Sequence, residues 1–345
     1  MIFAAAQQML VPIATANDAV IDRCHDCRAV IRRSAPRKDA LMSEARTPAS
    51  ATDKIERLFF LDINDGRILS SAIDGTDLKL IVQRAGRSPD GILVDSENGW
   101  IYWTEMGNDY NAHDGSIERM DLDGGNHITL IPPGSTLVTP KQIQLDRDNG
   151  KLYWCDREGM RVMRANIDGS DIETLVQNGD SPEDSADIER WCVGIALDLP
   201  LGQIYWTQKG PPDAGLGRIF RAGINIPAGE TATSRSDIET LLDKLPEPID
   251  LELDLATRTI YWTDRGNLPR GNTVNRAAMN DIAATSEVVL EGLDEGIGLS
   301  LDLPNSRMFF TDIGGNLYSA SLDGSGEREL LHHAGSFTGI VYAEV

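Results

Sequence analysis

Apolar and polar residues alternate through most of the chain after residue 53, in short runs that are separated by turn residues. Such alternation over four to eight residues is typical of β-strands with one buried face. In five places an alternating run ends in Asp, and a second run follows after a tight turn such as Ser-Glu-Asn-Gly; the five acids are Asp95, Asp146, Asp198, Asp254 and Asp302. Each of these pairs of runs is predicted to form a β-hairpin.

The second strand of each hairpin carries a repeated tetrapeptide. It reads Tyr-Trp-Thr-Glu at 102–105, Tyr-Trp-Cys-Asp at 153–156, Tyr-Trp-Thr-Gln at 205–208 and Tyr-Trp-Thr-Asp at 261–264, with Phe-Phe versions ending at Asp62 and Asp312. The copies recur every 43 to 56 residues, and two further short strands follow each copy. Four antiparallel strands repeated six times predict an all-β fold, a six-bladed β-propeller.

The two ends of the repeat array predict how the ring closes. The first repeat begins directly with its second strand, whereas the chain ends in an extra strand at 339–343 that is similar to the first strands of other repeats. We therefore expect the C-terminal strand to complete blade one, which leaves no free sheet edge. The propeller is predicted to span residues 53–345, preceded at 1–52 by a disordered or weakly helical leader.

The tetrapeptide, the Gly-Ile-x-x-Asp strand and the Leu-Asp-Gly turn together resemble the YWTD propeller family, the class B repeats of the low-density lipoprotein receptor. The resemblance covers about residues 54–345, with departures at Leu61, Cys155 and Gln208. It implies the fold and says less about function, because one fold hosts many activities. The aromatic pair is expected to pack between blades, since strand neighbours point to opposite faces, and the acid to bond backbone amides at a blade junction.

The charge of the chain excludes several classes of partner. Its net charge is −22, and the acid excess lies entirely after residue 50. The acidic part of the chain after residue 50 therefore repels nucleic acid and anionic lipid. No apolar run is long enough to span a bilayer. Four cysteines are too few for a disulfide scaffold, which favours a reducing, cytoplasmic location. A secretory signal at the N-terminus is the alternative, weakened by the missing basic segment.

Loop length predicts which face of the propeller carries the functional site. Links from first to second strand, and most from third to fourth, are tight, whereas the long loops all fall on the opposite face. Ligands are usually bound by long loops on a rigid scaffold. The expected channel mouth is formed by the residue four positions before the strand-ending acid, or before its equivalent, in each inner strand. These residues are Gly91, Gln142, Gly194, Asp250, Gly298 and Gly339. Glycine is expected to open this mouth, and Gln142 and Asp250 to make it polar.

The favoured function is a cofactor-free enzyme of specialised metabolism that takes a small-molecule substrate. In overall plan the chain is similar to stand-alone fungal hetero-Diels-Alderases of tropolone sesquiterpenoid pathways, which join a reactive polyketide-derived intermediate to a terpene. Trp191 and Phe337 would form an aromatic wall, Lys141, Gln142 or Arg190 would polarise a carbonyl, and Asp250 would orient the donor. Further substrate contacts are expected from Asp90, Tyr110, His113, Arg190, Cys192, Arg265, Glu295, Phe337 and Thr338.

Two other functions remain open. A protein-binding module would use the same loops, with Tyr110, His113 and Trp191 as anchors. A metal-dependent lactonase or hydrolase would need several ligands at the axis, where only Asp250 and Gln142 are expected, so no metal site is predicted.

The cysteines offer little further chemistry. The lone pair Cys24 and Cys27 offers too few ligands for structural zinc. Cys155 is expected in the core, and Cys192 is either a reactive thiol at the mouth or buried.

Overall fold

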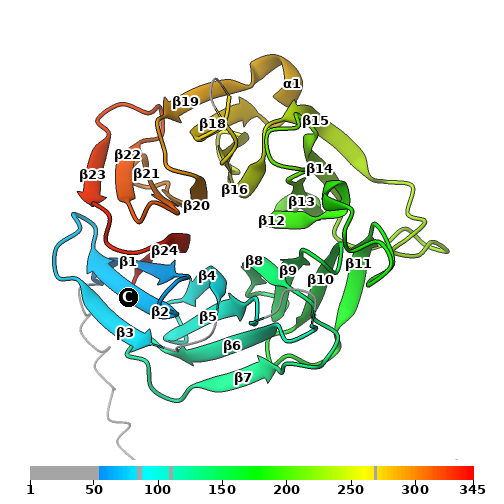
Figure 1. The fold of residues 1–345 in the computed structure, drawn as a ribbon, viewed down its shortest axis with the longest axis horizontal. Coiled ribbons are helices and arrows are strands. Elements are labelled where there is room, and N and C mark those ends of the chain that lie inside the picture. Colours follow the sequence, from blue (N-terminus) through cyan, green and yellow to red (C-terminus); the bar gives the residue numbers. More distant parts are fainter. Residues whose placement is uncertain (1–53, 84–87, 109–111, 268–269) are drawn as a thin grey trace, which may run out of the picture. The chain divides into compact units, whose positions relative to one another are not determined.

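The computed structural model describes residues 54–345 except 84–87, 109–111 and 268–269. The expected leader at 1–52, with Cys24 and Cys27, lies outside these residues. Within the described part, strands form six separate four-stranded antiparallel sheets, which are arranged as blades around a common centre (Figure 1). The predicted six-bladed β-propeller is confirmed.

The strands of each blade are given from the innermost to the outermost. Blade 1 holds β24 (Phe337–Glu344), β1 (Glu56–Asp62), β2 (Arg67–Ala72) and β3 (Lys79–Gln83), and blade 2 holds β4 (Pro89–Asp95), β5 (Trp100–Glu105), β6 (Ser116–Asp121) and β7 (Ile128–Ile131). Blade 3 holds β8 (Pro140–Asp146), β9 (Lys151–Asp156), β10 (Arg161–Asn166) and β11 (Glu173–Gln177), and blade 4 holds β12 (Cys192–Asp198), β13 (Gln203–Gln208), β14 (Gly217–Gly223) and β15 (Glu239–Leu245). Blade 5 holds β16 (Pro248–Asp254), β17 (Thr259–Asp264), β18 (Thr273–Ala278) and β19 (Glu287–Glu291), and blade 6 holds β20 (Gly296–Asp302), β21 (Arg307–Asp312), β22 (Leu317–Ser321) and β23 (Arg328–Leu331). Short helical turns lie at η1 (Ile188–Arg190), η2 (Leu199–Leu201) and α1 (Ile282–Thr285).

The C-terminal strand closes the ring as predicted. β24 pairs antiparallel with β1, in a register that joins Glu344 to Glu56 and Ile340 to Phe60. In Figure 1 the red end of the chain accordingly lies against the blue strands that begin the described part. Blade 1 is thus built from both ends of the array.

Aromatic pairs pack between blades, as the tetrapeptide predicts. Tyr153 of blade 3 shares a buried core with Trp206 of blade 4, and Tyr205 of blade 4 shares the next core with Trp262 of blade 5. The same arrangement holds at the other four junctions. The acid that ends the tetrapeptide accepts backbone amides from the segment between blades, as Asp156 does from Thr139 at 2.6 Å.

The third residue of the tetrapeptide has a further role that the sequence did not reveal. The hydroxyl of Thr207 accepts a hydrogen bond from the amide of Gly194 and donates one to the carbonyl of Ile249, both at 2.7 Å. It therefore links the inner strands of blades 4 and 5. Thr104, Thr263 and Thr311 make the same two bonds in their blades. In blade 3 this position is Cys155, whose thiol donates to the carbonyl of Gly194 at 3.2 Å.

Replacing Thr207 by Val is expected to destabilise the protein. The change leaves a buried amide and a buried carbonyl without partners, at about 1–3 kcal/mol each. The free energy of unfolding from urea denaturation is therefore expected to fall by about 2–4 kcal/mol. Thr207→Ser keeps the hydroxyl and serves as the control. Equal stability of the Val and Ser variants would show that the bridge contributes nothing.

The mouth glycines serve strand packing instead of opening the channel. A Cβ added to Gly194 would lie 2.2 Å from the carbonyl oxygen of Ile249, and one added to Gly339 would lie 2.4 Å from that of Asp90. Both contacts are with the backbone of a neighbouring inner strand. Glycine at these positions lets adjacent blades approach closely.

The two faces differ in loop length as predicted, with two exceptions on the tight-turn face. One is the link between β18 and β19, residues 279–286, which contains α1. The other is the longer link between β14 and β15, residues 224–238, which Arg235 holds in place by donating to the carbonyls of Leu175 at 2.9 Å and Gly223 at 2.6 Å. Among the described residues, no helix has the length and apolarity to cross a membrane.

Candidate functional site

A ring of six residues surrounds the channel on the long-loop face, one from each blade. Each member directly follows the tetrapeptide and donates its backbone N–H to the residue that leads into an inner strand, as Lys209 does to Trp191 at 3.4 Å. We call these residues the upper ring: Ile63, Met106, Arg157, Lys209, Arg265 and Ile313. Blades 3, 4 and 5 thus contribute bases, and blades 6, 1 and 2 contribute apolar side chains.

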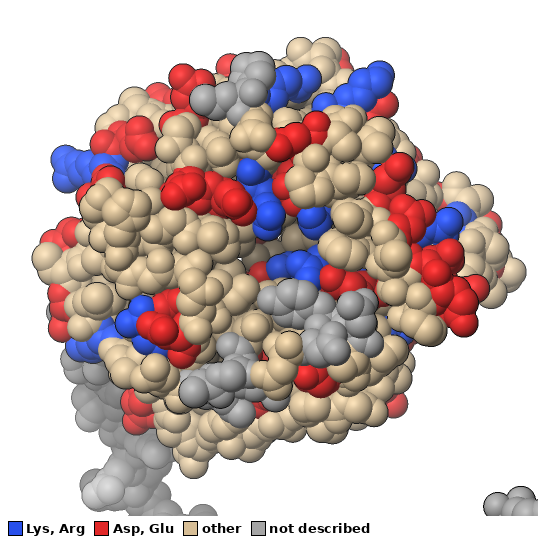
Figure 2. Space-filling view, in the orientation of Figure 1, with Lys and Arg blue, Asp and Glu red and all other residues tan. Residues whose placement is uncertain are grey.

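Trp191 lies among the bases of the upper ring. The guanidinium of Arg157 lies 5.0 Å from the centre of its ring, and the ammonium of Lys209 lies 5.6 Å from it. The indole N–H donates to the carbonyl of Ser185 at 2.8 Å, which fixes the ring orientation. Trp191 therefore supports two cations through cation–π contacts and is not a bare apolar wall. Figure 2 shows Lys and Arg side chains around the central hollow of this face.

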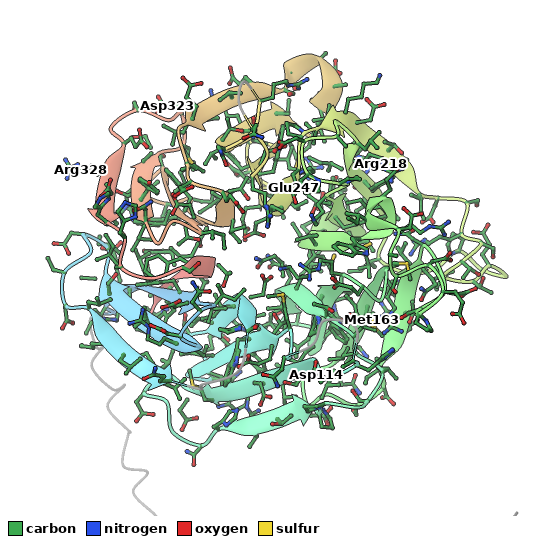
Figure 3. All side chains as sticks on the ribbon, viewed as in Figure 1. Asp114, Met163, Arg218, Glu247, Asp323 and Arg328 are labelled. Atoms are coloured by element: carbon green, nitrogen blue, oxygen red, sulfur yellow. The ribbon has the colours of Figure 1, made fainter. Side chains whose placement is uncertain are left out.

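Carboxylates compensate these bases. Lys209 bonds to Glu247, and Arg265 lies 3.3 Å from both Glu247 and Glu295. Arg157 bonds to Glu158 at 2.8 Å. Figure 3 shows Glu247 beside the centre of the ring. Burial lowers the pKa of Lys209, although Glu247 opposes the shift. The mouth is thus a band of paired charges.

A buried ion pair lies one level below the upper ring. Lys141 of β8 bonds to Asp90 of β4 and contacts the sulfur of Met106 at 3.3 Å. Burial lowers the pKa of Lys141 to about 8, although the neighbouring Asp90 carboxylate partly opposes this shift. The sequence placed both residues at the mouth, and the structure brings them together across two blades.

The equivalent residues of the other blades complete a plug ring across the channel: Asp90, Lys141, Val193, Ile249, Ile297 and Thr338. Their exposed fractions are only 1–7%. Val193, Ile249 and Ile297 form an apolar cluster of their own, separate from the six cores between blades. The plug ring is therefore half polar and half apolar, and it fills the channel below the mouth.

Gln142 and Asp250, two of the predicted catalytic residues, replace glycine between inner strands. Asp250 accepts the amide of Leu299 in the next blade at 3.0 Å and the amide of Leu251 at 2.9 Å. Burial raises its pKa well above the usual range, with a further contribution from Glu252. Gln142 is 5% exposed, and its amide nitrogen has no partner among the described residues. Both side chains lie within the wall of the channel.

Several predicted substrate contacts lie elsewhere. Phe337 is fully buried in the core of blades 6 and 1, edge-to-face with Phe60 at 4.9 Å, and cannot form a wall of the mouth. Cys192 is fully buried in the core of blades 3 and 4, with Cys155. Thr338 is buried and donates to the carbonyl of Pro89 at 3.0 Å.

The remaining predicted contacts belong to the loops. Arg190 is bound by Asp187 at 2.7 Å and by the carbonyl of Asn178 at 2.7 Å, so its donors shape the loop that carries Trp191. His113 is half-buried, and its carbonyl accepts the amide of Gly134 in the link between β7 and β8. Tyr110 lies outside the described residues. Glu295 and Arg265 form one of the pairs of the mouth.

Four residues of the mouth were not predicted from the sequence: Arg157, Lys209, Glu158 and Glu247. A signal was present, because the residue after the tetrapeptide is basic in three consecutive blades and apolar in the other three. Within the described residues, no group of three or more His, Cys, Asp or Glu is placed to hold a metal ion.

Comparison with known proteins relates the chain to one family of repeats. The family model for the low-density lipoprotein receptor repeat class B matches residues 56–96. A protein of Pyricularia oryzae named low-density lipoprotein receptor-related protein 1 is 49% identical over 243 residues, which cover 67% of this chain and 77% of that protein. A Cochliobolus heterostrophus protein named 3-hydroxyacyl-CoA dehydrogenase-like protein LAM1 is 42% identical over 248 residues, which cover 68% of this chain and about half, 52%, of that protein.

Among solved structures, the chain is similar to one in a nidogen/laminin complex. The TM-score is 0.66 at 20% identity, and the match covers 84% of this chain and 98% of the other. At this identity the likeness concerns the fold alone.

Proposed function

The chain belongs to the family of low-density lipoprotein receptor class B (YWTD) repeat propellers, and from that premise we propose that it is a cofactor-free enzyme that promotes a cycloaddition of the hetero-Diels–Alder type. The observation that carries the proposal is the two-sided mouth. Three bases lie on blades 3 to 5, and apolar side chains lie on blades 6, 1 and 2, above a channel that side chains fill.

This arrangement matches what a cycloaddition requires. Two carbon–carbon or carbon–oxygen bonds form from the π electrons of the two reactants, and no atom, proton or electron leaves. The protein therefore has to gather the reactants, exclude water and polarise one of them. Holding two reactants in place can supply several kcal/mol, about 7–11 in well-oriented cases.

Each half of the mouth has a part in this chemistry. Arg157 and Lys209 lie over Trp191, and both can donate to the carbonyl oxygen of a heterodiene, where negative charge increases as the bonds form. Ile63 and Ile313, both partly exposed, offer a surface for a terpene-like alkene, whereas Met106 is buried against Lys141. This assignment transfers the donor role to residues of the upper ring, because Lys141 is paired with Asp90, Gln142 is buried in the channel wall and Arg190 is bound within its own loop.

The test is a comparison of metabolites. A strain that lacks the gene is complemented with the native protein or with the double variant Arg157→Met/Trp191→Leu, and extracts are analysed by mass spectrometry. We expect the native protein to restore a product whose mass equals the sum of two accumulated precursors. The double variant should form roughly 10²-fold less of it, the usual effect of removing a transition-state donor.

Arg221→Met is the matched control. Arg221 also lies over an aromatic ring, that of Tyr205 at 5.9 Å, and pairs with Glu239, but it belongs to β14, away from the mouth. It should complement like the native protein. If deletion changes no precursor or product pair, the protein is a non-catalytic binding module, and the proposal is wrong.

A further inference from the structure

A second pocket lies at the opposite mouth of the channel, on the tight-turn face. Its volume is about 420 Å³, and inner strands of five blades together with the link after β12 line it. The plug ring separates it from the upper ring, so it is distinct from the site described above. We call it the lower pocket.

The walls of the lower pocket combine apolar surface with one inward carboxyl group. Leu145, Leu301 and Val341 provide apolar walls, and Glu252 lies among them, only partly exposed. Among the described residues, the Glu252 side chain has one hydrogen-bond partner, the amide of Gln144 at 3.3 Å. Glu252 belongs to blade 5 and Gln144 to blade 3, so the bond passes across the channel wall of blade 4, where Ala196 holds the equivalent position.

The other charges of the lower pocket do not neutralise Glu252. Arg147 is held at the rim by Asp95 at 3.0 Å and Glu97 at 3.1 Å, on the side of blade 2. Asp148 adds a further acid to the lining. Burial raises the pKa of Glu252 to about 7, and the bond from Gln144 lowers it. An isolated carboxylate in such a place is costly unless a cation accompanies it.

We propose that the lower pocket binds a small organic ammonium ion, whose charged group pairs with Glu252 and whose apolar body lies against the leucine and valine walls. The pairing needs an ionised carboxylate. Binding at a pH below 7 therefore displaces the proton from Glu252, and binding above 7 meets the carboxylate already ionised. This inference does not depend on the proposed function.

Benzylammonium is the probe, measured by titration calorimetry on the full chain. It stays charged between pH 6 and 8, so its Kd should fall about tenfold over this range as the ionised fraction of Glu252 rises. At pH 6 binding should release close to one proton, seen as a dependence of the heat on the buffer, and at pH 8 hardly any. Benzyl alcohol, its neutral counterpart, should bind at least tenfold more weakly and release no proton.

Variants localise the effect. Glu252→Gln should weaken benzylammonium binding at pH 8 at least tenfold and abolish the proton release. Asp148→Asn, at the pocket rim, should retain the pH dependence, and Arg157→Met/Trp191→Leu, at the other mouth, should bind as the native protein does. Failure of benzylammonium to bind, or equal binding by Glu252→Gln, would overturn the proposal.

Thermal unfolding would check that Glu252→Gln is folded and would also test the cost of the Glu252 carboxylate. Because the folded-state pKa of Glu252 lies above its ordinary value of 4.5, the folded protein holds the proton more tightly, and stability is lost as pH rises from about 4.5 to 7. The Gln variant should match the native protein at pH 4 and unfold at a higher temperature at pH 8. A variant that is less stable at pH 8 would contradict a strained Glu252 carboxylate in the lower pocket.

Discussion

Asp90→Asn is expected to destabilise the propeller by about 3–5 kcal/mol at pH 6, because it leaves the buried Lys141 ammonium without its counter-charge. Asp90 is 1% exposed, and Lys141 is 7% exposed between blades 2 and 3. The loss should appear as a lower free energy of unfolding in urea. Adding Lys141→Met to Asp90→Asn removes the uncompensated charge and should restore most of that loss.

The pH dependence identifies the cause. The folded-state pKa of Lys141 is lowered to about 8 from 10.5. Between pH 8 and 10.5 the folded protein therefore binds fewer protons than the unfolded chain, and its stability rises with pH across that range. Removing Asp90 lowers the pKa of Lys141 further, which moves the start of this rise to a lower pH. The deficit of Asp90→Asn should therefore shrink between pH 6 and 9.

Asp77→Asn is the control for this pair. Asp77 also pairs with a lysine, Lys79 at 2.8 Å, but half of its side chain is exposed, and solvent screens the pair. We expect little change in stability at either pH. If Asp90→Asn behaves like Asp77→Asn, the plug ring tolerates an unpaired lysine, and the ion pair does not hold blades 2 and 3 together.

The fold could be predicted from the sequence because each blade repeats the same packing rule. Tyr153 and Trp206 occupy opposite faces of their strands, so a tetrapeptide in every blade is enough to fill every junction. The missing first strand of blade 1 and the extra strand at the C-terminus then leave one way to close the ring. None of these inferences depends on side-chain detail.

The site was harder to predict because the inner strands are irregular. The pairing register shifts between Pro89 and Ile92, and again between Cys192 and Ile195. At a shift, simple alternation no longer tells which residue faces the channel. For this reason Asp90 was found as a channel residue, whereas Phe337, expected at the mouth, and Cys192, expected either there or buried, lie in the cores between blades.

Two of the three bases of the upper ring were missed for another reason. Arg157 and Lys209 follow directly after a tetrapeptide that serves packing, and only a comparison across blades separates them from the scaffold. At the position after the tetrapeptide, blades 3 to 5 thus carry a base where the other blades carry an apolar residue. We propose that function in this propeller arises from departures from the repeat, at a position that every blade keeps equivalent through the same backbone bond.

Removal of β24 is expected to abolish soluble folding. A chain that stops after Ser336 loses the inner strand of blade 1, including the fully buried Phe337 and the buried Ile340. Truncating a buried phenylalanine alone costs about 3–5 kcal/mol, which approaches the whole stability of many domains. The loss also exposes the edge of β1, whose backbone groups can then pair with other chains.

The measurement is the soluble, monomeric yield after expression, followed by size-exclusion chromatography. Gly339→Val is the matched point variant, because its side chain would meet the carbonyl oxygen of Asp90, to which the added Cβ already lies at 2.4 Å, and so would force β24 away from β4. Tyr342→Phe is the control. It keeps the ring that stacks on Phe309 and loses only the bond to Glu56, so it should stay soluble. A truncated chain that remains monomeric and unfolds cooperatively would show that five complete blades close without β24.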